Sequence, residues 1–201
     1  VADGAKKSFD FSFGGAIAHR GVGEQATDAG ADLDDFFGGE QVIFLCAHND
    51  DGAMGLVINN PNREITLRDV LQGANMPVPK GHLPPVYIGG PVELESGFIL
   101  CSSDYASSNA LEVTPEVLLS RDSRLLLDIA RGQGPAHYLF MLGYAGWGPG
   151  QLESELVDNS WITVPGNFDI LFKTPDEFKW KLAAFSFGID IAVFGDVIGN
   201  A

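Results

Sequence analysis

The sequence predicts an α+β protein built around a mixed β-sheet. Apolar runs of strand length and amphipathic stretches of helix length alternate irregularly over residues 41–201, without a regular strand–helix repeat. Asp51-Gly52 between two apolar runs predicts a hairpin, and a hairpin requires antiparallel pairing. No internal repeat and no linker divides this region, and a length of 201 residues suits one folding unit. A single domain is therefore expected.

Residues 1–35 form a poorly patterned arm that is rich in glycine and acidic side chains. Within it, residues 9–13 alternate phenylalanine with polar residues, which is typical of an edge strand, and residues 14–19 could extend that strand. Residues 20–35 have the composition of a mobile loop. We therefore expect the organised domain to begin at about residue 36.

The strands of the sheet are predicted by short apolar runs rich in β-branched and aromatic residues. Glycine, proline or asparagine bounds most of these runs, and these residues are typical of turns. The predicted strands are 41–47, 54–58, 86–88, 97–101, 110–114, 137–142 and 161–164.

Two helices are predicted in the middle of the chain. Thr66 with Asp69 three residues later is a capping-box pattern, and it predicts a short helix that ends near Gly73. Residues 122–131 form an amphipathic pattern with Gly132 at its end.

A further helix is predicted at the end of the chain, where residues 174–177 combine a capping box with proline at the first helical position. Phe178, Leu182 and Phe185 recur at helical spacing and form an apolar stripe along it, and Gly188 ends it.

Residues 143–150 are predicted to form a glycine-rich turn between the strand 137–142 and another helix. Gly148 suits the N-cap of that helix, Pro149 its first position and Gln151 its third. Its inward residues are predicted to be Leu152, Leu156 and Val157, with Glu153 and Glu155 facing outward. The turn itself has two interpretations. Its two aromatic side chains either complete a packed core or line a ligand site, since glycine lets other groups approach closely.

The charge balance excludes some partners. Twelve Lys and Arg against 27 Asp and Glu give a formal net charge of −15, which opposes binding to nucleic acid and to anionic membranes. The apolar runs are too short to cross a bilayer, and the N-terminus does not resemble a signal peptide. Cys46 and Cys101 lie in strand-like runs with no metal or redox spacing, and no feature supports a disulfide between them. We expect a reducing, cytoplasmic setting.

His48 begins the most polar cluster in the better-organised part of the chain, His48-Asn49-Asp50-Asp51. A turn in which Asn and Asp bond their own backbone accounts for the His48–Gly52 cluster, whereas a metal would need ligand spacing that the other histidines lack. No metal and no cofactor is predicted. An alternative is a nucleophile and base, formed by Cys46 or by Ser102/Ser103 with His48 or His137. Cys46 and His48 are two residues apart on a predicted strand, so they would share a face.

Several motifs in the same order resemble the YqgE/AlgH family of bacterial proteins. They are Cys46–Asn59 (CAHNDDGAMGLVIN), Gly89–Val92 with Gly97-Phe98, Gly143–Trp147 (GYAGW) with Gly150–Glu153, Glu155, Asn159–Trp161, Trp180 and Gly188–Asp190. The resemblance covers residues 36–201. It departs from the family at the N-terminus, where no Met-Pro turn follows the first strand and Gly21–Ala31 reads as an insertion.

The resemblance implies a compact α+β fold around a mixed, barrel-like β-sheet with several flanking helices, in a cytosolic bacterial protein. The family has no established biochemical activity. Its members are often labelled transcriptional regulators, and that label does not imply a DNA-binding surface.

We therefore predict a non-catalytic protein that binds a small ligand or a protein partner, in a regulatory role. Its pocket is expected where the turns 143–151, 48–52 and 89–91 meet, because glycine and polar side chains concentrate there. The alternatives are a hydrolase-type enzyme that uses His48 as general base, and a transcriptional regulator without a clear DNA-binding surface. The predicted ligand-binding residues are His48, Asn59, Gly89, Gly90, Tyr144, Gly146, Trp147 and Gln151.

Overall fold

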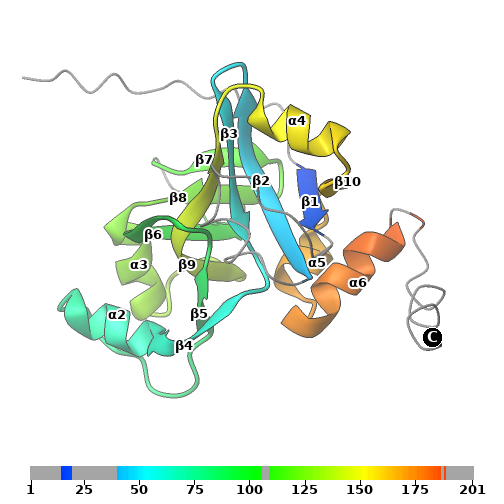
Figure 1. Ribbon diagram of the computed structural model, residues 1–201. Helices are drawn as coiled ribbons and strands as arrows, with labels where there is room; N and C mark the ends of the chain where they lie inside the picture. The colour runs from blue at the N-terminus through cyan, green and yellow to red at the C-terminus, as the bar shows by residue number, and fades with distance from the viewer. Residues whose placement is uncertain (1–14, 20–39, 106–108, 187, 189–201) are drawn as a thin grey trace, which may run out of the picture.

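A computed structural model describes residues 15–19, 40–105, 109–186 and 188, and only the backbone of the first of these segments. Its strands belong to a ten-stranded sheet that is nearly closed into a barrel (Figure 1). The strands are β1 (Gly15–His19), β2 (Gln41–Asn49), β3 (Gly52–Val57), β4 (Pro61–Thr66), β5 (Pro85–Ile88), β6 (Val92–Ser102), β7 (Leu111–Thr114), β8 (Val117–Ser120), β9 (Tyr138–Trp147) and β10 (Trp161–Pro165).

The strand order along the main path is β10-β1-β2-β3-β9-β6-β8-β7, with β5 joined to β9 and β4 joined to β5. All pairs are antiparallel except β5 with β9, which is parallel. The sheet is therefore mixed, as expected, and the α+β class is confirmed. The described helices are α2 (Leu67–Gly73), α3 (Ser123–Ala130), α4 (Gln151–Val157), α5 (Phe168–Phe172) and α6 (Asp176–Ser186).

Strand β9 holds the two parts of the sheet together. Its first half pairs with β6 and with β5, with Phe140 opposite Ile99 and Val86. Its second half pairs with β3, from Ala145 to Trp147. Between these halves, Gly143 has a φ of +70°, which an L-residue with a side chain adopts only with strain. The strand thus changes partners at a glycine.

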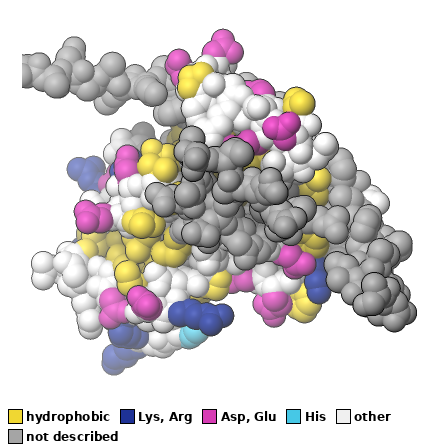
Figure 2. Space-filling view, viewed as in Figure 1, with side chains coloured by type: hydrophobic (Ala, Val, Ile, Leu, Met, Phe, Trp, Pro, Cys, Tyr) yellow, Lys and Arg dark blue, Asp and Glu magenta, His cyan; other side chains and the backbone are white. Residues whose placement is uncertain are grey.

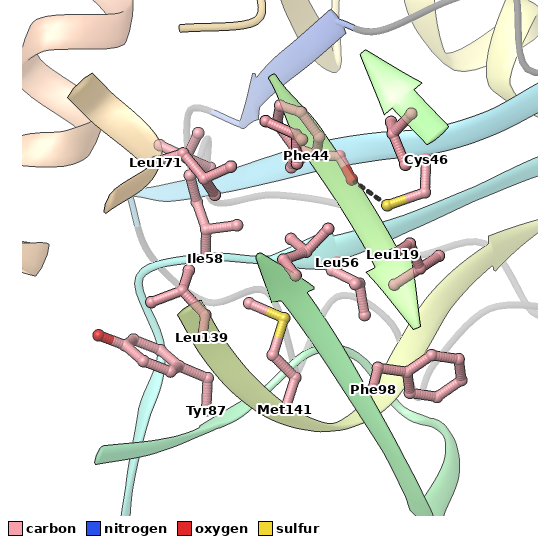
Figure 3. Packing of buried hydrophobic residues seen from close by; sticks show 14 of the residues in the cluster. Phe44, Cys46, Leu56, Ile58, Tyr87, Phe98, Leu119, Leu139, Met141 and Leu171 are labelled. Atoms are coloured by element: carbon pink, nitrogen blue, oxygen red, sulfur yellow. Dashed lines mark hydrogen bonds between the residues drawn. The ribbon is translucent and has the colours of Figure 1, made fainter. Parts of the chain in front are cut away.

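The interior of the barrel is filled by side chains from nearly every strand (Figure 3). Phe44 and Cys46 of β2 lie with Leu56 of β3, Phe98 of β6 and Met141 of β9, all of them buried. Helices α5 and α6 contribute Leu171, Trp180, Ala183 and Ala184 to the same cluster. These two helices therefore complete the interior core.

The helices α2, α3 and α4 cover the outer faces of the sheet. Leu152 of α4 packs with Ile43, Leu45, Trp147 and Trp161 on one outer face. Helices α2 and α3 cover the other, where their buried residues join Val86, Ile99, Cys101 and Phe140; those residues are Leu67, Leu71, Leu125, Leu126, Ile129 and Ala130. Because strand residues alternate between faces, this layering needs apolar residues on both sides of the central strands. It explains why those strands read as continuous apolar runs.

The N-terminal arm contributes a strand to the sheet. β1 lies between β2 and β10, so it is not the edge strand that we expected. Residues 9–13 and 20–35, which the sequence predicts as an alternating strand and a loop, lie outside the described residues.

The predicted turn at 143–150 is mostly strand. β9 continues to Trp147, since Ala145 and Trp147 pair with β3, and α4 begins at Gln151 after a left-handed Gly150 N-cap. The predicted N-cap at Gly148 is therefore two residues too early. Within α4, Val157 is 79% exposed, which contradicts its predicted inward position. Glu155, predicted to face outward, bonds the indoles of two tryptophans.

The last helix presents the opposite face to that suggested by its apolar stripe. Phe178, Leu182 and Phe185 are exposed, whereas Trp180 and Lys179 are buried. Ala183 and Ala184 are buried beside them, because small residues let the helix lie close to the sheet. At its start, the Thr174 hydroxyl donates to the carbonyl oxygen of Asp169.

Three elements have no counterpart in the sequence prediction, namely β4, β8 and α5. The capping box of α2 is confirmed, with the Asp69 backbone donating to the Thr66 hydroxyl and the Thr66 backbone to the Asp69 carboxylate. Helix α3 is confirmed too, capped by Asp122. In the described part of the chain, no helix has the length and apolar character needed to cross a membrane.

Candidate functional site

His48 lies at the end of β2 and contacts the helix that follows β9. Its Nε2 is 2.5 Å from Oε1 of Glu153 in α4, and the two side chains are 24% and 51% exposed. A hydrogen bond from the Glu153 backbone and the one from His48 lower the pKa of the Glu153 carboxyl. A carboxylate that holds an imidazole can orient it for proton transfer. The sequence analysis missed this pair because its members are 105 residues apart.

Cys46 and His48 lie on opposite faces of the sheet, so the expectation that they share a face is wrong. The register of β2 against β3 shifts between Leu45 and Ala47, which makes Cys46 the extra residue of a β-bulge. Cys46 points into the interior core, whereas His48 is paired with Ala53, which belongs to the outer cluster under α4. The bulge separates the candidate nucleophile from the candidate base.

The thiols and the serine hydroxyl occupy structural positions. Both cysteines are free and buried. Burial raises the pKa of the Cys46 thiol strongly, and raises that of Cys101 to about 11 with help from the charge of Asp104. The Ser102 hydroxyl donates to Asp104, and it accepts a hydrogen bond from the backbone N–H of His137 at 3.1 Å. Neither a thiolate nor an activated hydroxyl results from these contacts.

The glycines predicted for the site lie where backbones approach closely. A Cβ on Gly90 would lie 2.0 Å from the carbonyl carbon of Tyr144, and one on Gly89 would lie 2.5 Å from the carbonyl oxygen of Gly143. On the other side of β9, a Cβ on Gly52 would lie 2.1 Å from the Trp147 carbonyl oxygen. The 89–91 and 48–52 turns therefore both contact β9, at different points along it.

The aromatic residues of the predicted pocket do not face each other. Tyr144 is half-buried and packs toward the interior core, where its ring lies 5.7 Å from that of Phe98. Trp147 is buried on the outer face and meets Trp161 edge to face, with ring centroids 5.8 Å apart. Gly146 lies between them in the strand, beside the Tyr144 ring. The two aromatic side chains are thus on opposite faces of β9.

The remaining predicted residues fix loops and helix ends. Asn59 accepts from the Val42 backbone N–H at 2.9 Å and donates to the Glu40 carbonyl oxygen at 2.8 Å, so it fastens the start of β2. Gln151 accepts from the Gly148 backbone N–H at 3.0 Å and donates to Glu155 at 2.9 Å.

Glu155 is the centre of a polar clamp. One of its oxygens accepts from the indole N–H groups of Trp147 and Trp161, at 2.8 and 2.7 Å, and the other accepts from Gln151. The clamp joins α4 to β9 and β10, and it gives a packing role to the residues that it connects, Trp147, Gln151, Glu155 and Trp161. Glu153 and Glu155 bond different partners, the first His48 and the second the two indoles.

A buried lysine was not singled out by the sequence analysis. Lys179 of α6 is 2% exposed, and its Nζ lies 2.9 Å from Oδ1 of Asp176. It donates to the Ile58 carbonyl oxygen at 2.7 Å, and the Tyr87 hydroxyl bonds the same Asp176 carboxylate at 3.2 Å. Burial lowers the pKa of the lysine, and it raises the pKa of Tyr87 together with the Asp176 charge. No apolar periodicity could have indicated this group, because it interrupts the buried face of α6.

Two surface cavities are defined by described residues. One, of about 450 Å³, lies between β4, the start of α2 and residues 81–85. The other, of about 260 Å³, lies between the β7–β8 turn and the residues that lead into α5. No group of three or more His, Cys, Asp or Glu among the described residues is arranged to hold a metal ion.

The fold defines the chain as a single-domain α+β barrel protein, with α4 packed at one place on the outside of its sheet and α2 and α3 at another. The model of the AlgH-like family (DUF179) matches residues 29–192. The chain is 45% identical over 161 residues to a UPF0301 protein of Desulfotalea psychrophila, which covers 80% of this chain and 85% of that one. It is 42% identical over 163 residues to a UPF0301 protein of Ruegeria pomeroyi, covering 80% and 88%. This chain belongs to the AlgH-like family.

Solved structures agree with this assignment. The solution structure of the AlgH protein from Pseudomonas aeruginosa matches over 100% of both chains, with a TM-score of 0.70 and 32% identity. A crystal structure of a Corynebacterium diphtheriae protein shares the fold at 17% identity, with a TM-score of 0.61 over 83% of each chain.

Proposed function

We propose that this chain is a non-catalytic binding protein with a regulatory role in the bacterial cytoplasm. The observation that carries the proposal is that the candidate nucleophiles are engaged in packing. Cys46 and Cys101 are buried thiols, the Ser102 hydroxyl is bonded to Asp104, and Glu155 is held by two indoles. Covalent catalysis needs a nucleophilic side chain that is accessible to substrate and activated by a base.

A small ligand is the partner that the surface favours. The larger cavity, of about 450 Å³, falls in the size range of small-molecule sites. A regulatory role does not require contact with DNA, and a net charge of −15 opposes such contact. The residues predicted to line a pocket do not surround one space, because Asn59 bonds the start of β2, His48 lies near its end and Tyr144 packs toward the interior core.

A melting-temperature screen against a metabolite and nucleotide library tests the proposal. A ligand present at 100 times its Kd stabilises the native state by about 2.7 kcal/mol. For a chain of this length, that corresponds to a rise of roughly 5–10 °C. A compound that is consumed on incubation, rather than recovered unchanged, would refute the non-catalytic part.

A hydrolase that uses His48 as general base is the second candidate, favoured by the 2.5 Å contact between His48 and Glu153. Its test is hydrolysis of p-nitrophenyl acetate by the purified protein and by the His48→Gln and Glu153→Gln variants. The hydrolase predicts turnover in the wild type and a loss of about 100-fold or more in the His48 variant. Equal rates in all three proteins would eliminate it.

A further inference from the structure

One edge of this acidic protein is not acidic. Residues 62–85 carry Arg63, Arg68, Lys80 and His82 with only Glu64 and Asp69 as acidic residues, whereas the chain has 12 Lys and Arg against 27 Asp and Glu. Figure 2 shows Lys and Arg side chains with a histidine along the lower edge of the molecule, where Figure 1 places α2 and β4. Basic residues therefore outnumber acidic ones at this edge, by three Lys or Arg to two Asp or Glu, in contrast to the rest of the chain.

None of these cations forms an ion pair with another residue that the structure describes. Among the residues that the structure describes, the ion pairs involve His48, Arg121, Lys173 and Lys179. The guanidinium of Arg68 makes one long contact, from Nη2 to the Gly81 carbonyl oxygen at 3.5 Å. A guanidinium has five N–H donors, so this contact leaves Arg68 able to bind an anion with two parallel hydrogen bonds.

Two polar neighbours, Asp69 and Asn62, are already engaged. The Asp69 carboxylate accepts from the Thr66 backbone at 2.9 Å and from its hydroxyl at 2.5 Å, and these bonds lower the pKa of Asp69. The Asn62 side-chain oxygen accepts from the backbone of Glu64 and Ile65. Arg68 and His82 are thus the side chains in this edge best placed to recognise a charged group.

Arg68 and His82 line the cavity of about 450 Å³, and its remaining lining supplies apolar surface. Ile65 is 40% exposed within it, and Leu83 and Pro84 are half-buried. Cations beside exposed apolar side chains match a ligand that has both a negative charge and a compact apolar body. The cavity is too small for an extended polyanion, and the acidic remainder of the chain would repel one.

We propose that this groove binds a small organic anion, in which a carboxylate, sulfonate or phosphate group is joined to an apolar group. Arg68 pairs with the anionic group, His82 donates a hydrogen bond to it, and Ile65, Leu83 and Pro84 contact the apolar body. Lys80 adds positive charge next to the rim. The inference rests on the proposed binding function and assigns it a site and a ligand class.

The test uses 8-anilinonaphthalene-1-sulfonate as the anionic probe and N-phenyl-1-naphthylamine as its neutral analogue, with fluorescence titration of the full chain. Arg68→Gln is expected to weaken sulfonate binding by about 10-fold, because a charge-assisted bond to a partly exposed group is lost. Lys181→Gln, at an exposed position of α6, removes the same charge and is expected to leave the affinity unchanged. The neutral probe is expected to bind more weakly and to respond to neither variant.

Competition identifies the anionic group. Displacement of the probe by inorganic phosphate supports a phosphate ligand, and displacement by 4-phenylbutyrate alone supports a carboxylate. If neither competes while Arg68→Gln still weakens binding of the sulfonate probe, the anionic group is a sulfonate. If both probes respond equally to Arg68→Gln, the groove does not recognise anions and the inference is wrong. Circular dichroism and melting temperature confirm that the Arg68 variant is folded.

Failure of this inference and failure of the binding function give different results. Sulfonate binding that is insensitive to Arg68→Gln refutes the anion site, while a hit in the metabolite screen still supports a binding protein. Substrate turnover by the wild type refutes the non-catalytic function, whatever the probe shows.

Discussion

Replacing Lys179 by methionine removes a buried ammonium while keeping a side chain of similar length. The ammonium bonds the Asp176 carboxylate at 2.9 Å and the Ile58 carbonyl oxygen at 2.7 Å, and the lysine is 2% exposed. Removing one partner of a buried ion pair destabilises a protein by about 3–5 kcal/mol. Asp176 is 25% exposed and keeps its bond from Tyr87, so we expect the lower end, about 3 kcal/mol.

The loss of stability caused by replacing Asp176, the partner of Lys179, has an upper limit that can be calculated. Asp176→Asn leaves the Lys179 ammonium buried without its counter-ion, but the lysine can respond by losing its proton. Deprotonating a lysine of ordinary pKa at pH 7 requires about 5 kcal/mol, so the loss cannot greatly exceed that value. The double variant, with Met and Asn, should lose less than the sum of the two single variants because no charge is left unpaired.

Urea denaturation of the three variants measures these losses. Lys181→Met is the matched control, because this lysine is exposed on the same helix and its replacement should change stability by less than about 0.5 kcal/mol. A loss below about 1 kcal/mol for Lys179→Met, or strict additivity in the double variant, would show that the buried pair does not hold α6 in place.

Three further outcomes are expected. Gly143→Ala should lower the free energy of unfolding by at least about 2 kcal/mol in urea denaturation. Alanine is strained at a φ of +70°, and its Cβ would meet a backbone oxygen 2.4 Å away. Wild-type stability of this variant would refute the conformation of β9. Leu182→Glu should lower the free energy of unfolding by less than about 1 kcal/mol, since Leu182 is 45% exposed. Ala183→Glu should prevent folding, because Ala183 is 0% exposed. The reverse order of stability in thermal melts would refute the orientation of α6. Burial raises the pKa of Cys46 and Cys101, so both thiols should resist Ellman's reagent at pH 8 until the chain is unfolded. Because the pKa values of both thiols are higher in the folded than in the unfolded chain, the stability that they contribute should decline as pH rises above about 9. Labelling of the native protein would contradict the first expectation, and a stability that does not change with pH above about 9 would contradict the second.

Most strands could be predicted because their signal is local. Residues 41–47, 54–58 and 137–142 are continuous apolar runs, and burial on both faces of the sheet makes them so. β4 was missed because four of its six residues are exposed and three of these are polar, which leaves Ile65 alone and no apolar pattern to detect. The continuation of β9 through Gly143 was missed because glycines that permit close packing also resemble a turn.

The environment of the predicted site residues depends on contacts that the sequence does not display. The His48–Glu153 pair and the Lys179–Ile58 bond join positions more than 100 residues apart. The bulge at Cys46 reverses the alternation of β2, so that a two-residue spacing no longer means a shared face. The α6 stripe failed for a different reason: the buried face there consists of Trp180, two alanines and the stem of Lys179, and this set shows no apolar stripe in the sequence.

The position of β9 in the sheet constrains the order in which the protein is made and folded. β3 pairs with Trp147 and β5 with Phe140, so strands completed early in synthesis wait for a partner that leaves the ribosome some 50 to 90 residues later. Until then, the nascent chain can form the β2–β3 and β7–β8 hairpins and pair β6 with β8, but the edges that β9 joins stay unpaired. Unpaired strand edges during slow, non-local assembly are the surfaces through which nascent chains aggregate. The yield of folded protein in the cell should therefore depend on a chaperone that covers those edges until β9 emerges.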